Sequence, residues 1–218
     1  MTFSLDILSC DAFVTEELGG FLEIQEYCKE YALSHIPLME RRRLDQGARG
    51  VLTIIEDCQC PIVFSSFNGE INRSFKMYQT LREDSLISPT VFSLSVLNAI
   101  PALCAILFKN THEILAISEK MSLEYGLLNA YLLLSQKETQ ECMVISYREV
   151  ENFEKSCEVI IVAMKVARGD GVRLTLKQEE CASHQQVISE ANFLKHYQKS
   201  SQWISLSDSE RWEWNVLS

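Results

Sequence analysis

The stretch from Ile87 to Gln136 constrains the fold of this chain more than any other. Residues 99–108 are apolar without interruption, residues 113–118 (EILAIS) have the composition of a buried strand, and residues 123–134 again contain few polar side chains. A helix that is apolar on every side must be enclosed by protein. We therefore predict two fully buried helices separated by a strand, within a layered sandwich that covers both helices on two sides.

Strand and helix patterns also alternate before this stretch, which favours an α/β layered fold. Asn98 stands where it would cap the helix over 99–108, whose first turn tolerates Pro101 because those amides have no intrahelical partner. Gly19-Gly20 is expected to end the first strand and its exit. We predict strands over 3–14, 61–66, 113–118 and 141–147, and helices over 23–34, 44–57, 71–81, 99–108 and 123–134.

The last third of the chain changes character. The apolar residues 158–167, the turn Arg168–Gly171 and the alternating residues 172–176 together predict a β-hairpin, and a short helix is expected over 190–198. We expect the tryptophans of the tail to pack it onto the domain rather than to bind a ligand. These tryptophans are Trp203, Trp212 and Trp214.

Composition excludes some classes of function. The net charge of −10 argues against nucleic-acid binding, which requires clustered Lys and Arg. The one basic run, Arg41, Arg42 and Arg43, is typical of a solvated helix start, and the alternative is a landing patch for an acidic carrier protein. Linker-like composition is missing, so we expect one domain over residues 1–218.

The chain start and the cysteines suggest a reducing compartment. Residues 1–4 lack the basic start and apolar core of a signal peptide, and the longest apolar run is far too short to span a bilayer. We therefore expect a cytoplasmic protein whose eight cysteines are free thiols. Cys58 and Cys60 form a C-x-C pair, which without further ligands is a weak metal signal. We expect no cofactor and no metal.

The residues taken alone reveal no catalytic set. The sequence contains no G-x-S-x-G elbow, no phosphate-binding glycine loop and no H-E-x-x-H pattern. No pair of carboxylates stands out for acid/base catalysis. The histidines are widely separated and lack partners at ligand spacing: His35, His112, His184 and His196.

Four segments resemble the N-terminal half of β-ketoacyl synthases of the thiolase superfamily. They are PIVFSSFNGEINRSF from Pro61, SPTVFSLSVLNAIPALCAILFKN from Ser88, EILAISEKMSLEYGLLNAYLLL from Glu113 and ECMVISY from Glu141. The segment PLMERRR from Pro37 resembles one that precedes the first long helix in the same family. The segment from Ser88 is most similar to the short synthase-like chain length factors of aryl polyene biosynthesis. The resemblance implies a truncated thiolase-like α/β fold, with helices on both sides of a sheet, plus the C-terminal hairpin and short helix.

The resemblance also implies that catalysis has been lost. An active synthase carries a nucleophilic Cys where the strand over 113–118 turns into the next helix. An ungapped comparison places that Cys at Met121, and a slip of a few residues places it at Ser118 or Glu119. A methionine thioether is not an acyl acceptor. The two histidine motifs of active synthases are absent from the sequence as well.

A half-length synthase without a nucleophile implies a partner subunit. In this family the strand before the nucleophile pairs across a two-fold axis, so we expect Glu113, Leu115 and Ile117 to contact a catalytic ketosynthase in a heterodimer or a dimer of heterodimers. We expect the loop over 90–94 to reach the partner's acyl tunnel, with Val91 and Phe92 setting its floor. An acyl carrier protein would bind transiently. The predicted loop contacts are Thr90, Val91, Phe92 and Leu94.

Two other functions stay open at this point. One is an acyltransferase or thioesterase that uses Cys104, Ser93, Ser95 or Ser118 as its nucleophile. Burial in an apolar helix should raise the pKa of Cys104 and lower its reactivity. The other is an assembly scaffold that does not influence the product.

Overall fold

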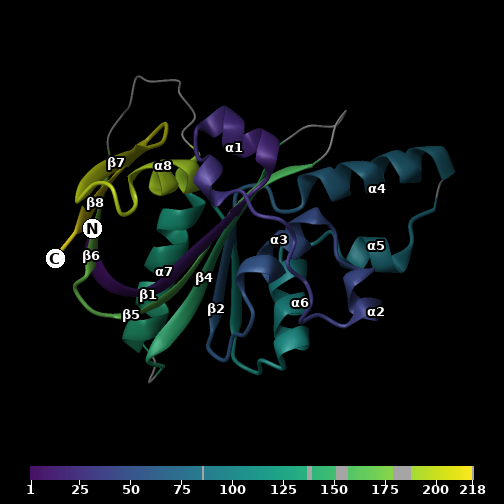
Figure 1. The fold of residues 1–218 in the computed structure, drawn as a ribbon, viewed down its shortest axis with the longest axis horizontal. Coiled ribbons are helices and arrows are strands. Elements are labelled where there is room, and N and C mark those ends of the chain that lie inside the picture. The colour runs from purple at the N-terminus through teal and green to yellow at the C-terminus, as the bar shows by residue number, and fades with distance from the viewer. Residues whose placement is uncertain (85, 137–138, 151–156, 179–187, 218) are drawn as a thin grey trace.

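An eight-stranded mixed sheet organises the computed structural model, which describes residues 1–84, 86–136, 139–150, 157–178 and 188–217 (Figure 1). The strand order is β3-β2-β4-β5-β1-β6-β8-β7. β2 is parallel to β3 and β4, and the remaining pairs are antiparallel. The strands are β1 (Thr2–Val14), β2 (Ile62–Ser66), β3 (Ile114–Ser118), β4 (Glu141–Val150), β5 (Glu158–Arg168), β6 (Val172–Gln178), β7 (Gln202–Leu206) and β8 (Glu210–Val216).

Helices cover both faces of this sheet, as expected of an α/β layered fold. One face packs against α7 and α8, and the other packs against α3 and α6. Successive strand residues serve opposite faces: Val63 belongs to the first core, and its neighbours Ile62 and Phe64 belong to the second. The helices are α1 (Glu16–Leu22), α2 (Leu38–Arg41), α3 (Gln46–Ile54), α4 (Ile71–Asp84), α5 (Pro89–Ser93), α6 (Ala99–Phe108), α7 (Ser122–Gln136) and α8 (Ser189–His196).

Most predicted strands and helices are confirmed to within a few residues, but the region after β1 is not. Gly19 and Gly20 lie inside α1, and the predicted helix over 23–34 contains only a short 3₁₀ turn at Gln25–Tyr27. The chain folds back here, because Glu23 adopts a left-handed conformation with φ 58°. A Cβ atom on Gly19 would come within 2.2 Å of Cys28 Sγ, so the return segment requires a glycine in α1.

The strands of the predicted hairpin exist, but their direct pairing is wrong. β1 lies between β5 and β6, and Leu5 is opposite both Arg168 and Val172. The Asp6 carboxylate accepts a hydrogen bond of 2.8 Å from the amide of Gly171 and holds the turn across the end of β1. The two strands therefore separate because the long apolar β1 fits between them and pairs with both.

The two helices predicted to be fully buried differ. α7 is largely buried beneath α8 and the C-terminal strands, and Trp212 and Trp214 are at most 1% exposed in the same core. The prediction that the tryptophans pack the tail onto the domain is confirmed. α6, however, leaves Ile106 71% exposed, so its predicted enclosure in a two-sided sandwich is wrong. Asn98 precedes α6, but its side chain caps no amide.

The described residues contain no helix with the length and apolar character needed to cross a membrane. No group of three or more metal-binding side chains occurs among them either.

Candidate functional site

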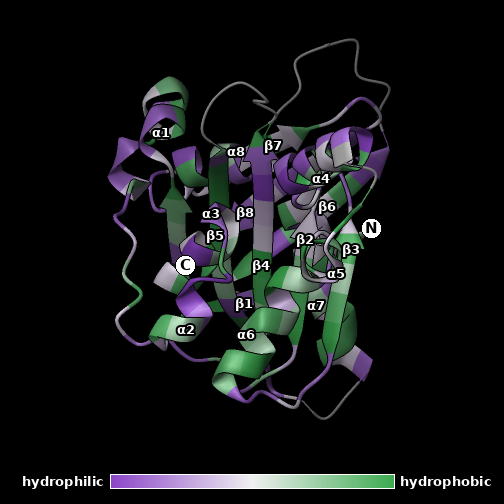
Figure 2. Ribbon diagram, turned by 90° about the vertical axis from the view of Figure 1, so that its right-hand side faces the viewer, coloured by the Kyte–Doolittle hydropathy of each residue, from purple (hydrophilic) through white to green (hydrophobic). Residues whose placement is uncertain are grey.

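The carboxyl ends of β2, β3 and β4 lie at one edge of the sheet, because these strands are parallel. After β2 the chain first builds β3 on one side and then crosses to build β4 on the other. Such a reversal leaves a crevice at the carboxyl ends, where α/β proteins bind their ligands. β4 becomes hydrophilic near its carboxyl end, as Figure 2 shows, and two polar clusters lie in this region.

The first polar region is the elbow between β3 and α7. Ser118 donates a hydrogen bond of 2.9 Å to the carbonyl of Phe67, and the amide of Glu119 donates to that of Ser66. Ser118 and Glu119 are exposed, whereas Met121 is 2% exposed and belongs to the core beside α7. The residue that the ungapped comparison aligns with the nucleophile therefore packs inward and is closed to a substrate.

A buried carboxylate, Glu190, lies directly behind the elbow. It accepts hydrogen bonds from the hydroxyl of Ser122, from the hydroxyl of Ser146 at 2.6 Å and from Arg148 Nε at 3.3 Å. Arg148 Nη2 also donates to the carbonyl of Lys120 at 2.8 Å. These contacts fix the first turn of α7 to β4 and α8, and they leave the carboxylate fully occupied.

A second buried carboxylate joins α7 to the C-terminal segment. Glu124 accepts hydrogen bonds from the hydroxyl of Ser189 and, at 3.2 Å, from the indole of Trp214. Burial raises the pKa of Glu124 above its ordinary value, and the hydrogen bond from Ser189 opposes this. Sequence patterns did not predict this pair of contacts to Glu124. A lone Glu inside the largely apolar pattern of residues 123–134 was the available signal.

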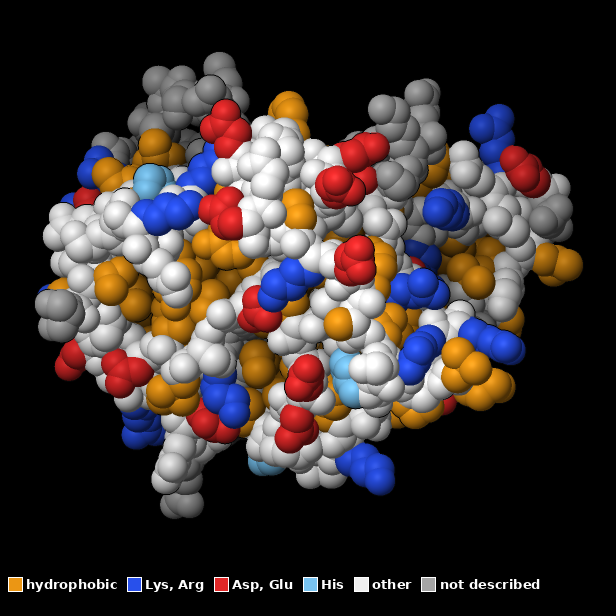
Figure 3. Space-filling view, viewed as in Figure 1, with side chains coloured by type: hydrophobic (Ala, Val, Ile, Leu, Met, Phe, Trp, Pro, Cys, Tyr) orange, Lys and Arg blue, Asp and Glu red, His pale blue; other side chains and the backbone are white. Residues whose placement is uncertain are grey.

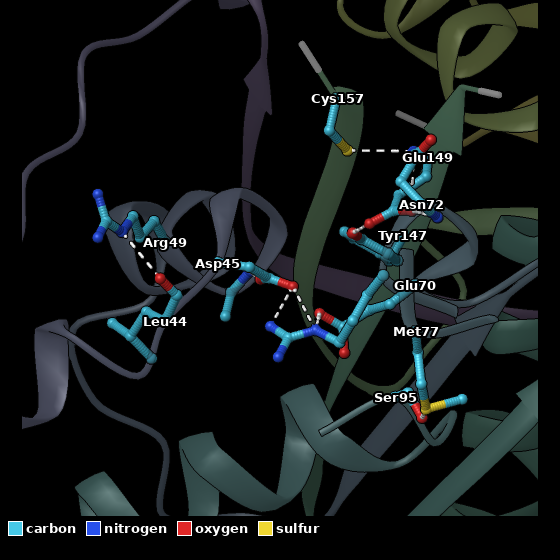
Figure 4. A network of polar contacts seen from close by, with 12 residues as sticks. Leu44, Asp45, Arg49, Glu70, Asn72, Met77, Ser95, Tyr147, Glu149 and Cys157 are labelled. Atoms are coloured by element: carbon cyan, nitrogen blue, oxygen red, sulfur yellow. Dashed lines mark hydrogen bonds and ion pairs between the residues drawn. The ribbon is translucent and has the colours of Figure 1, made fainter. Parts of the chain in front are cut away.

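The second polar region joins α3 to α4 (Figure 4). The Asp45 carboxylate caps α3 by accepting from the amide of Ala48 at 2.9 Å, and it pairs with the Arg73 guanidinium. Burial, followed by a hydrogen bond to Asp45, raises the pKa of Glu70 to about 10. Burial also favours a higher pKa for Asp45, but the hydrogen bonds from Glu70 and Ala48 and the charge of Arg73 hold it below its ordinary value. Glu70 is therefore protonated and Asp45 ionised at neutral pH.

Glu149 extends this region to the end of β4. It accepts a hydrogen bond of 2.6 Å from the hydroxyl of Tyr147 and two further bonds from the amide and side chain of Asn72. Burial raises the pKa of Glu149, and the hydrogen bonds oppose the increase. Burial and then the charge of Glu149 raise the pKa of Cys157 to about 12, so this thiol is not a nucleophile.

The predicted partner contacts fall on two separate elements. β3 is an edge strand of the sheet, with Leu115 37% exposed, Glu113 exposed just before it and Ile117 half-buried. Figure 2 shows that β3 is hydrophobic along its length. Val91 and Phe92 are 40% and 57% exposed. They lie on α5, so the prediction of a loop over 90–94 is wrong: residues 90–93 are helical, and the half-buried Leu94 follows them.

The basic run lies at α2 and just after it. Arg41 is half-buried and donates to the carbonyls of Ile36 and Ser34 at 2.6 and 3.0 Å. Arg42 and Arg43 are exposed, and a nitrogen of Arg43 lies 3.5 Å from a carboxylate oxygen of the half-buried Glu40. Arg41 thus has a structural role in its loop, whereas the two following side chains point to the surface.

Two of the alternative nucleophiles, Cys104 and Ser95, lie in surroundings that do not activate them. Cys104 is buried in α6, and burial raises its pKa to about 12, as the sequence analysis predicted. The Ser95 hydroxyl donates to the carbonyl of Phe92 at 2.8 Å, so it serves to end α5. Cys58 and Cys60 lie 3.8 Å apart between their sulfur atoms and are 2% exposed. The hydrogen bond from Cys60 lowers the pKa of Cys58 to about 7.

Two of the histidines, His112 and His196, make their contacts away from both polar regions. His112 Nδ1 contacts the Asn110 side chain at 2.9 Å, and the His196 ring stacks on Trp203. His184 and Cys181 lie outside the described residues.

Comparison with known proteins decides the family. The model for the N-terminal domain of β-ketoacyl synthases matches residues 22–215, which is nearly the whole chain. The chain belongs to this family. No curated protein matches the β-ketoacyl synthase-like chain.

Solved structures show the same fold. One is the ketosynthase ApeO in complex with its chain length factor ApeC from Xenorhabdus doucetiae, with TM-score 0.77, 20% identity and coverage of 98% of this chain and 99% of that chain. The ishigamide ketosynthase/chain length factor gives TM-score 0.56 at 9% identity, over 69% of this chain and 53% of that one. A β-ketoacyl synthase from Burkholderia phymatum gives TM-score 0.51 at 8% identity, over 72% of this chain and 53% of that one. The synthase-like chain thus matches about half the length of these last two structures.

Proposed function

We propose that the synthase-like chain is a non-catalytic chain length factor, which pairs with a separate ketosynthase and shapes its acyl tunnel in aryl polyene biosynthesis. The observation that most supports this is the end-to-end match with a chain of a ketosynthase–chain length factor complex, over 98% of one chain and 99% of the other. The chain therefore matches one chain of such a complex over nearly its whole length.

The elbow supports a non-catalytic role. None of the five residues from Ser118 to Ser122 is a cysteine, and the side chain aligned with the nucleophile is buried. The hydroxyl of Ser118 donates to a backbone carbonyl, and that of Ser122 donates to a carboxylate that already accepts from two other side chains. Ser122 is also 0% exposed, so its hydroxyl is closed to a substrate.

The exposed edge of the sheet supports a partner subunit. Among the described strands β3 pairs only with β2, so its other side presents an open edge beside the 36% exposed Ile114 and the 37% exposed Leu115. Such an edge is a template for adding a strand from another chain. We infer that the ketosynthase covers it, and that α6 with its exposed Ile106 lies within the same interface.

Val91 and Phe92 would then set the tunnel floor. Both side chains are exposed on α5, whose end lies against α4 through the contact of Ser95 Oγ with Met77 Sδ at 3.7 Å. Bulk at the closed end of a tunnel limits the growing acyl chain, because overpacking costs about 1–3 kcal/mol. The proposal includes one domain over residues 1–218, a cytoplasmic location and transient contact of the carrier protein with Arg41–Arg43.

Co-expression with the cognate ketosynthase tests the pairing and the tunnel together. The two chains should co-purify, and Phe92→Ala should lengthen the product of the reconstituted pair because it removes bulk from the tunnel floor. Phe21→Ala is the matched control, since Phe21 is 84% exposed on α1, and it should leave product length unchanged. Stable pairing with an unchanged product for Phe92→Ala would favour a scaffold.

Mass spectrometry tests the rival enzyme function. Incubated with an acylated carrier protein, the chain should keep its unmodified mass, because Cys104 is buried and its pKa is raised. An acyl adduct on Cys104, Ser93, Ser95 or Ser118 would establish an acyltransferase or thioesterase instead.

A further inference from the structure

A cleft of about 500 Å³ opens beside the second polar region, the one that joins α3 to α4. It lies at the carboxyl end of β4 and the start of α4. This volume is in the range of small-molecule sites. The position also matches the reversal of strand order between β2 and β4, where α/β folds bind ligands. The cleft is lined by Arg42, Arg43, Leu44, Asp45, Gln46, Gly47, Asn72, Arg73, Lys76, Glu149 and Cys157.

Positive charge dominates this lining, although the whole chain has a net charge of −10. Four cationic side chains face two carboxyl groups. The Asp45 carboxylate is already paired with Arg73, and Glu149 accepts from Tyr147 and Asn72. Figure 3 shows Lys and Arg side chains gathered over this part of the surface, between α2 and α4. The remaining cations are the exposed Arg42, Arg43 and Lys76.

The first turn of α3 adds backbone donors to the same cleft. Gln46 and Gly47 are the first two residues of this nine-residue helix, and amides at these positions have no intrahelical partner. The Asp45 side chain caps the next amide, that of Ala48. Helix N-terminal amides combined with Arg and Lys side chains suit a phosphate group.

Asn72 provides an independent sign of a ligand. Its side chain is 6% exposed in the cleft wall, and among the described residues its Oδ1 atom accepts no hydrogen bond. Native proteins rarely leave a buried polar atom unpaired. A hydroxyl group carried on the same ligand would satisfy this acceptor.

We propose that this cleft binds a small phosphate ester, with the phosphate at Arg42, Lys76 and the first amides of α3, and a hydroxyl at Asn72. Arginine donates through a planar fork that matches phosphate oxygens, and several such donors favour phosphate over a single carboxylate. The cleft shares Arg42 and Arg43 with the proposed carrier-protein contact, but a small-molecule phosphate site goes beyond the proposed function, and none of its residues belongs to β3 or α5.

Calorimetric titration of the full-length chain tests the proposal with three probes: inorganic phosphate, glycerol 3-phosphate and malonate. Both phosphate probes should bind saturably, and malonate should bind at least about tenfold more weakly. The absence of saturable phosphate binding, or equal binding of malonate, would overturn the proposal. If inorganic phosphate binds but glycerol 3-phosphate does not, a phosphate ester is ruled out as the ligand.

Paired charge reversals locate the site. Arg42→Glu with Lys76→Glu should weaken glycerol 3-phosphate binding about tenfold or more. Arg82→Glu with Lys195→Glu makes the same charge change at exposed positions outside the cleft. This double variant should bind glycerol 3-phosphate with an affinity within about twofold of the wild-type chain. An equal loss in both double variants would mean general charge attraction and would refute the site. Co-purification with the ketosynthase, measured on the same proteins, reports separately on the proposed pairing.

Discussion

Two carboxyl groups at the carboxyl edge of the sheet have pKa values shifted from their ordinary ones. Glu70 and Asp45 share a proton beside Arg73, and the three residues come from the start of α3 and the start of α4. The sequence showed plentiful carboxylates but did not indicate which of them would meet. Their contact depends on the packing of α3 and α4 over the ends of β2 and β4.

Glu70 makes stability depend on pH. Its pKa is raised from 4.5 to about 10 in the folded chain, so the folded state retains a proton that the unfolded chain releases. The contribution is fully present below about pH 4.5 and is lost as pH rises towards 10. Between pH 6 and 9 the free energy of unfolding of the wild-type chain should therefore fall, relative to Glu70→Gln, by at least about 1 kcal/mol. Urea denaturation at several pH values measures this difference.

Glu56→Gln is the control for this prediction, since Glu56 is exposed and its variant should follow the wild-type pH dependence. A difference between the wild-type chain and Glu70→Gln that is constant with pH would show that the Glu70 carboxyl ionises in the folded chain.

Among the helices, glycines decide how closely the chain packs. A Cβ atom on Gly47 would meet the hydroxyl of Tyr147 at 2.1 Å, whereas one on Gly20 would meet nothing within 4 Å. Gly47→Ala should therefore cost about 1–3 kcal/mol of unfolding free energy through overpacking. Gly20→Ala, inside α1, should instead stabilise the chain by up to about 1 kcal/mol, because alanine favours a helix over glycine. Thermal unfolding compares the stabilities of the two variants. Equal changes in unfolding free energy for Gly47→Ala and Gly20→Ala would contradict the close contact of α3 with β4.

The two edge strands provide a matched test of the partner surface. Leu115→Lys on β3 should reduce the amount of co-purified ketosynthase about tenfold or more, because a charge on an edge strand opposes strand addition. Ile204→Lys on the opposite edge strand, β7, changes a residue that is 43% exposed and should leave pairing within about twofold. If the β7 variant loses the ketosynthase and the β3 variant keeps it, the partner binds the other edge.

At the scale of the whole molecule, the C-terminal segment covers α7. Trp214 packs in the core beside α7 and donates to the buried Glu124. Trp214→Ala should therefore cost about 3–5 kcal/mol, since it creates a cavity and removes one of the hydrogen-bond donors to that carboxyl. Ile204→Ala, on the neighbouring strand, should cost less than about 1 kcal/mol because its side chain is partly exposed. Urea denaturation measures the free energy of unfolding of both variants. Similar losses for Trp214→Ala and Ile204→Ala would show that the tail contributes little to the core.

Residue patterns alone predicted the strands β2, β3 and β4, the helices α4, α6 and α7, the family and the elbow without a cysteine, because apolar periodicity and local motifs are short-range signals. Three other features became visible only in the folded chain: β1 separates β5 from β6, α6 exposes Ile106, and Asp45, Glu70 and Arg73 meet. Each of these results depends on contacts between residues that are distant in the chain. Local propensity does not encode such contacts, since they follow from how whole faces of the sheet and helices bury their apolar surface together.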